Sequence, residues 1–77
     1  MTPDNIMKIL TDLLIFEHNE FLTELDGNLL EMADAIDSYF HVNEPDLMTV
    51  VDGDVHWLDL AVWVQDSKKE MGVWVYD

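Results

Sequence analysis

The sequence contains no cysteine, few basic residues and no long apolar run. Without cysteine it has neither a disulfide framework nor a thiolate metal site, so its 77 residues depend on a single apolar core. No segment approaches the length of a membrane span, about 18 apolar residues or more, and the first residues lack the pattern of a secretory signal. These absences predict one soluble domain, residues 1–77, in the cytoplasm and without membrane association.

Negative charge dominates the composition. Seventeen acidic residues against three basic ones give a formal net charge of −14. Between Lys8 and Lys68 there is no Lys or Arg, although this stretch holds 14 of the 17 acids. Such a field repels nucleic acid and anionic lipid, so we expect no direct nucleic-acid binding. Solubility or a salt-adapted proteome explains acidic proteins in general, but neither requires basic residues to be absent over so long a stretch.

Apolar spacing predicts two helices in the N-terminal half of the chain. The first covers about residues 3–25, with a weaker middle at Glu17-His18-Asn19. Asn28 followed by Glu31 has the form of a capping box, which predicts a second helix over about residues 29–41.

After Pro45 the apolar period changes to two. This pattern predicts a three-stranded antiparallel meander over about residues 47–51, 54–64 and 71–76, with Asp52-Gly53 as a two-residue hairpin turn. The expected fold is therefore α+β, in the order ααβββ. One face of the sheet is aliphatic and suits the helices, whereas the other face is aromatic. The aromatic face carries Trp57, Trp63, Trp74 and Tyr76.

The aromatic face has two interpretations. Tryptophan is usually largely buried, so these residues form core if a helix covers them. If nothing covers them, the face is a large apolar surface for a monomer, which predicts a protein-interaction module or a homodimer.

Patterns of catalysis and metal binding are weak. There is no cysteine nucleophile, and paired carboxylates carry no information in so acidic a chain. Asp52-Gly53-Asp54 followed by His56 lacks the spacing of a calcium loop and favours a turn. Asp37 and His41 are spaced to share a ligand face, but His41 is better placed to interact with the C-terminus of its helix. We expect neither an enzyme nor a cofactor or metal site.

Acidic residues recur at helical spacing in both predicted helices. Steps of three and four place carboxylates along one side of a helix, about 5–6 Å apart, which is comparable to the spacing of phosphates along a DNA strand. Ordinary solvated faces show the same spacing, but they mix both signs of charge. The predicted partner-binding residues are Glu17, Glu20, Glu24, Glu31, Asp34, Asp37, Glu44 and Asp46.

The segment Ala61-Val62-Trp63-Val64-Gln65-Asp66-Ser67, followed by Glu70, resembles the last hairpin of the phage uracil-DNA glycosylase inhibitor, a small acidic DNA mimic. The resemblance covers about ten residues and implies occupation of a glycosylase's DNA groove. In that family the contacts come mainly from a Glu-Ser-Ile strand between the two helices. Here that place is taken by Asp26-Gly27-Asn28, so the resemblance assigns no site residue.

Charge, spacing and resemblance together predict a DNA-mimic inhibitor, encoded by a phage or a mobile element and acting in the host cytoplasm. Its expected partner is a basic nucleic-acid-binding protein of host defence or repair, of the CRISPR, restriction or glycosylase type. The alternative is a non-mimic interaction module or homodimer that uses the Trp-rich sheet face.

Overall fold

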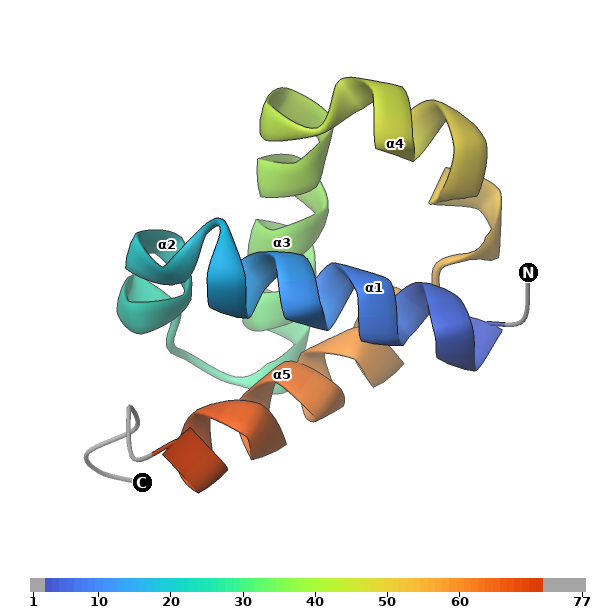
Figure 1. The fold of residues 1–77 in the computed structure, drawn as a ribbon. Helices are drawn as coiled ribbons and strands as arrows, with labels where there is room; N and C mark the ends of the chain where they lie inside the picture. Colours follow the sequence, from blue (N-terminus) through green and yellow to red (C-terminus); the bar gives the residue numbers. More distant parts are fainter. Residues whose placement is uncertain (1–2, 72–77) are drawn as a thin grey trace.

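The computed structural model describes residues 3–71, and these residues form helices joined by short turns. In Figure 1, α1 crosses in front of α3, α5 runs beneath α1, and α4 leads away to the right from the upper end of α3. No strand occurs among residues 3–71, so the predicted ααβββ fold is wrong. The elements are α1 (Pro3–Phe16), α2 (Asn19–Glu24), α3 (Leu29–Asn43), α4 (Pro45–Val51), the 3-10 helix η1 (Asp52–Asp54) and α5 (Trp57–Met71).

The helix predicted over residues 3–25 is two helices. It breaks at Glu17 and His18, in the segment that the sequence marks as weak. The backbone N–H groups of both residues donate to the carbonyl of Leu13, at 2.8 and 3.1 Å, which closes the end of α1. The break turns α2 back toward the core, where Leu22 and Leu25 are buried.

The second predicted helix is confirmed, with α3 extending two residues past the expected end at residue 41. Its capping box is present. Asn28 Oδ1 accepts from the N–H of Glu31 at 2.8 Å, and the N–H of Asn28 donates to Glu31 Oε1 at 3.2 Å. Gly27 precedes the box with a φ of +102°, a left-handed conformation that other residues rarely adopt.

The predicted meander is replaced by helices. Residues 47–51 lie in α4, because Pro45 occupies the first turn of a helix, where its fixed φ and missing N–H cost nothing. Gly53 lies in η1 and does not adopt the positive φ that the predicted hairpin turn requires. Residues 57–71 form α5, and residues 72–76 of the third expected strand lie outside the described part of the chain.

The core forms where α5 packs against α3, with α1 contributing a third apolar face. Leu60, Ala61 and Val64 of α5 have no exposed surface, and they follow helical spacing rather than strand alternation. Val62, which strand alternation would place on one face with Leu60 and Val64, is 37% exposed. Within residues 3–71, no helix is both long enough and apolar enough to cross a membrane.

Candidate binding surface

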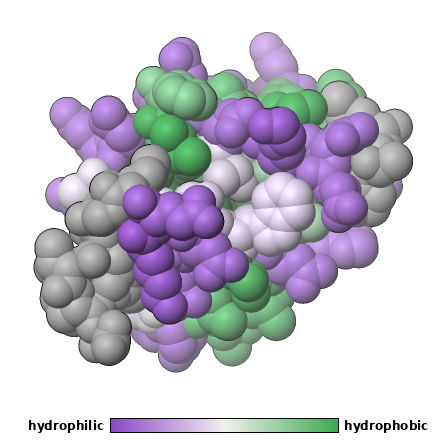
Figure 2. Space-filling model, turned by 60° about the horizontal axis from the view of Figure 1, so that its bottom comes forward, coloured by the Kyte–Doolittle hydropathy of each residue, from purple (hydrophilic) through white to green (hydrophobic). Residues whose placement is uncertain are grey.

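Carboxylates occupy the surface of the molecule on every helix. Sixteen of the 17 acidic residues, all except Asp77, lie in the described part of the chain, and none of them is buried. On the side where α5 lies, hydrophilic residues surround separate apolar patches (Figure 2). The surface is therefore acidic on several elements and is not confined to one loop.

The predicted partner-binding acids lie on three helices and the turns beside them. Glu20 and Glu24 are exposed on α2, but Glu17 lies before α2 because the helix breaks there. The first expected row of carboxylates, or stripe, consists of Glu17, Glu20 and Glu24, and it is thus not carried by one continuous helix. The second stripe is continuous on α3 and consists of Glu31, Asp34 and Asp37. Glu44 caps the end of α3, and Asp46 is exposed in the first turn of α4.

Basic side chains contribute little to this surface. Lys68 is only 2% exposed, and its Nζ donates to the backbone carbonyl of Leu25, which ends α2. Desolvation lowers the pKa of Lys68, and the nearby carboxylate of Asp26 opposes that shift. Lys8 is exposed, with Nζ 3.4 Å from Asp12 Oδ2. Burial of Lys68 thus leaves Lys8 and Lys69 as the exposed lysines.

His41 lies between two carboxylates, one from its own helix α3 and one from η1. Its Nδ1 lies 2.7 Å from Asp37 Oδ1, and its Nε2 lies 3.2 Å from Asp52 Oδ2. The pKa of His41 is raised, first by a hydrogen bond with the backbone of Asp37 and then by the side chain of Asp52. The sequence places His41 near the end of its helix, and it lies in the last turn of α3, but its ring contacts Asp37 O one turn earlier, at 2.8 Å, and not the terminal carbonyls. The sequence does not identify Asp52, which was expected in a hairpin turn.

Asp37, His41 and Asp52 also form a group that could hold a metal ion, since one ligand atom from each lies within 4.8 Å of the others. Each carboxylate, however, faces a different ring nitrogen. This arrangement suits an imidazolium with two N–H donors better than a single ion shared by all three side chains.

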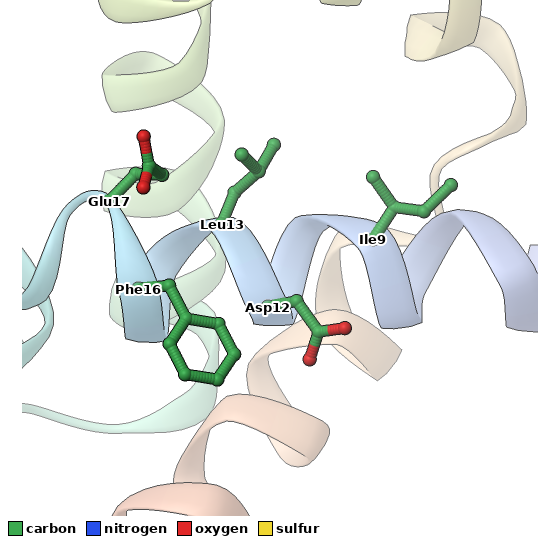
Figure 3. A pocket seen from close by; sticks show the side chains of 5 residues that line it. All are labelled: Ile9, Asp12, Leu13, Phe16 and Glu17. Atoms are coloured by element: carbon green, nitrogen blue, oxygen red, sulfur yellow. The ribbon is translucent and has the colours of Figure 1, made fainter.

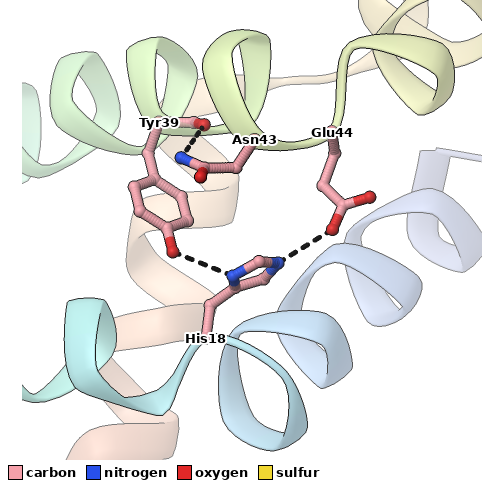
Figure 4. Close-up of polar contacts among 4 residues, drawn as sticks. All are labelled: His18, Tyr39, Asn43 and Glu44. Carbon is pink, nitrogen blue, oxygen red and sulfur yellow. Dashed lines mark hydrogen bonds and ion pairs between the residues drawn. The ribbon is translucent and has the colours of Figure 1, made fainter.

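A second histidine forms a chain of polar contacts between α2 and the corner where α3 meets α4 (Figure 4). His18 Nδ1 lies 2.8 Å from the hydroxyl of Tyr39, and its Nε2 lies 2.8 Å from Glu44 Oε2. Phe21 stacks on the Tyr39 ring, with centroids 3.8 Å apart. Glu44 is therefore engaged by a contact within the protein, as Asp37 is by His41, which makes these two less available to a partner than the other predicted binding residues.

Sequence reasoning missed Tyr39 and the role of His18. The two residues are 21 positions apart and lie on different helices, so no local spacing predicts their contact. His18 lies in the weak middle of the first predicted helix, where nothing in the sequence indicates burial, but its side chain is only 16% exposed.

Within residues 3–71 the predicted aromatic sheet face does not form, because residues 57–71 are a helix whose side chains point around its axis. Trp57 is half-buried against the core, with its ring 6.1 Å from that of His41. Trp63 is 37% exposed on the surface of α5. Trp74 and Tyr76 lie outside the described residues. The segment from Ala61 to Glu70, which resembles an inhibitor hairpin, is helical.

Comparison with known proteins identifies no similar protein. The sequence matches no protein-family model and no curated protein, and no solved structure matches the fold.

Proposed function

We propose that this protein is a small acidic DNA mimic that binds the basic, nucleic-acid-binding surface of another protein and keeps DNA away from it. The observation that supports this function is the imbalance of exposed charge. Sixteen described carboxylates lie at the surface, whereas one of the three lysines, Lys68, is buried. Lys and Arg that bind phosphates also bind carboxylates, so such a surface competes with DNA for the same side chains.

The helices support the proposal because they hold carboxylates in fixed positions. The capping box at Asn28 anchors the start of α3, which carries Glu31 and Asp34 on its exposed side. Exposed carboxylates at helical spacing repel each other by tenths of a kcal/mol per pair. No lysine adjoins these acids in the sequence, so the repulsion is not offset along the helix. The fold therefore presents an ordered row of negative charge, which attracts a cationic partner.

The proposed partner is a protein of host defence or repair that binds DNA through Lys and Arg. The proposed source of the inhibitor is a phage or a mobile element. An acidic inhibitor of this kind acts in the host cytoplasm, where such partners meet DNA. The mechanism involves no reaction. Its affinity should fall steeply as salt rises, because each ion pair releases less free energy when the charges are screened.

The test is capture from a nuclease-treated bacterial lysate at low salt, with two variants that remove the same number of charges. The stripe variant neutralises exposed acids of α2 and α3, and it keeps the capping box because glutamine also serves there. Its substitutions are Glu20→Gln, Glu24→Gln, Glu31→Gln and Asp34→Asn. The control variant neutralises exposed acids of η1 and α5. Its substitutions are Asp54→Asn, Asp59→Asn, Asp66→Asn and Glu70→Gln.

We expect the wild type and the control variant to retain a basic DNA-binding protein, and the stripe variant to lose it. If the stripe variant captures the same protein as strongly as the wild type, the proposed function is wrong. Equal loss by both variants would show that total charge, and not the carboxylates of α2 and α3, determines binding.

A further inference from the structure

The outer face of α1 carries a shallow hollow of about 300 Å³. Figure 3 shows its side chains on the front of the helix, with Ile9, Leu13 and Glu17 on one side and Asp12 and Phe16 on the other. All five lining residues belong to α1 or directly follow it, so the hollow is a groove on the surface of one helix.

Helical spacing explains the shape of this groove. Ile9, Leu13 and Glu17 are four residues apart and form one ridge along the helix, and Asp12 and Phe16 form the next ridge. A groove between two such ridges is the feature into which a ridge of another helix packs. The lining residues include none from α2 to α5, so the groove is open to a helix from outside.

The core depends little on two of the three apolar side chains of this face, Ile9 and Phe16, whereas Leu13 is half-buried and packs against the core. Ile6, Leu10 and Leu14, on the opposite side of α1, are at most 1% exposed and hold the helix against the core. Phe16 is 74% exposed and Ile9 is 37% exposed. Phe16 is the more costly of the two to leave in water, and it stands at the end of the groove beside Glu17.

Charge decides what kind of helix fits. Asp12 and Glu17 border the apolar groove, and the whole chain carries a net charge of −14. Within α1, Lys8 is the basic residue, and its Nζ already lies 3.4 Å from Asp12 Oδ2. A second copy would bring another charge of −14 against the first, which opposes self-association. A cationic helix satisfies both the carboxylates and the apolar groove.

We propose that this groove binds an amphipathic helix of the partner, with an apolar ridge between Ile9, Leu13 and Phe16 and with Lys or Arg facing Asp12 and Glu17. The inference rests on the proposed function and names one of the partner's elements. Carboxylates attract any cationic surface, whereas the groove selects one that also presents apolar side chains.

The test uses two synthetic helical peptides of equal length and equal positive charge. One carries leucine along one face and lysine along the other, and its counterpart carries glutamine in place of leucine. Both are titrated at low salt into the wild type, the groove variants Phe16→Ser and Ile9→Ser, and the control Leu30→Ser. Leu30 matches Phe16 in exposure, at 73% against 74%, but lies on α3.

We expect the wild type to bind the Lys/Leu peptide about tenfold or more tightly than the Lys/Gln peptide. Phe16→Ser should remove most of that difference, Ile9→Ser a smaller part, and Leu30→Ser none. Circular dichroism establishes that each variant is folded. Should Phe16→Ser fail to fold, Ile9→Ser alone carries the comparison.

Three results would overturn the groove proposal alone. The first is equal binding of the two peptides, which would leave the acidic surface supported and the groove without a role. The second is a Lys/Leu preference that persists in both groove variants. The third is a dimer of the wild type that Phe16→Ser dissociates in sedimentation equilibrium, because the occupant would then be a second copy. Failure to bind either peptide at low salt would reject both proposals.

Discussion

The two sides of α1 are both apolar, but they differ in what surrounds them. The inner side places Ile6, Leu10 and Leu14 in the apolar core, and these residues are almost fully buried. The outer side places Ile9 and Phe16 beside carboxylates and leaves them exposed. The inner side therefore determines stability and the outer side is available for binding, so mutations on the two sides should have separate effects.

The largest expected effect is on the inner side. Leu14→Ala removes a side chain with no exposed surface and leaves a cavity, which should lower the free energy of unfolding by about 2–5 kcal/mol. Ile9→Ala, on the outer side of the same helix, should cost less than about 1 kcal/mol. Urea denaturation of both variants measures the difference. Equal losses would mean that the outer side belongs to the core.

Two adjacent lysines of α5 show the same contrast between a buried and an exposed side chain. Lys68→Ala removes a buried stem and the charged donor to the carbonyl of Leu25, which should cost about 1.5–3 kcal/mol of unfolding free energy. Lys69→Ala changes an exposed residue and should stay within about 0.5 kcal/mol of the wild type. Denaturation curves for the pair provide the measurement. A neutral Lys68→Ala variant would contradict the role of this lysine in fastening α5 to the end of α2.

The smallest expected effect concerns the exposed His41 and depends on pH. Because the pKa of His41 in the folded state is raised above its usual 6.5, its contribution to stability is fully present below pH 6.5. The contribution is lost as pH rises through the raised pKa. His41→Gln should therefore destabilise the protein more at a pH of about 6 than at about 9.

Denaturation of His41→Gln and of the wild type at both pH values checks this prediction. His56→Gln is the matched control, because His56 lies 3.6 Å from a single carboxylate, that of Asp59, and does not join two elements. A difference between His41→Gln and the wild type that does not change with pH would show that the two carboxylates do not hold an imidazolium.

The sequence predicts α3 well because its signals are local. Asn28 and Glu31 satisfy each other's backbone groups whatever the rest of the chain does. The C-terminal half has no such signal. Its β-branched and aromatic residues favour strands. Leu60, Ala61 and Val64, however, also fit helical spacing, and packing of these residues against α3 stabilises the helix.

The candidate surface is predictable only in part. The exposure of Glu20, Glu24 and Asp34 follows from charge and spacing alone. The burial of Lys68 and the contact between His18 and Tyr39 depend on how helices far apart in sequence meet. The error about Asp52-Gly53 has a similar cause. The dipeptide suits a hairpin turn, but no strand pairs exist beside it within residues 3–71 to require one.

The most direct test of DNA mimicry is displacement by DNA at constant ionic strength. The protein is immobilised, loaded from a nuclease-treated bacterial lysate at low salt, and washed with increasing duplex DNA or with an uncharged polymer as control. Because carboxylates and phosphates compete for the same Lys and Arg side chains, we expect a basic protein to elute with DNA and to stay bound in the control. Retention of that protein at saturating DNA, or capture of no basic protein at all, would contradict the proposal.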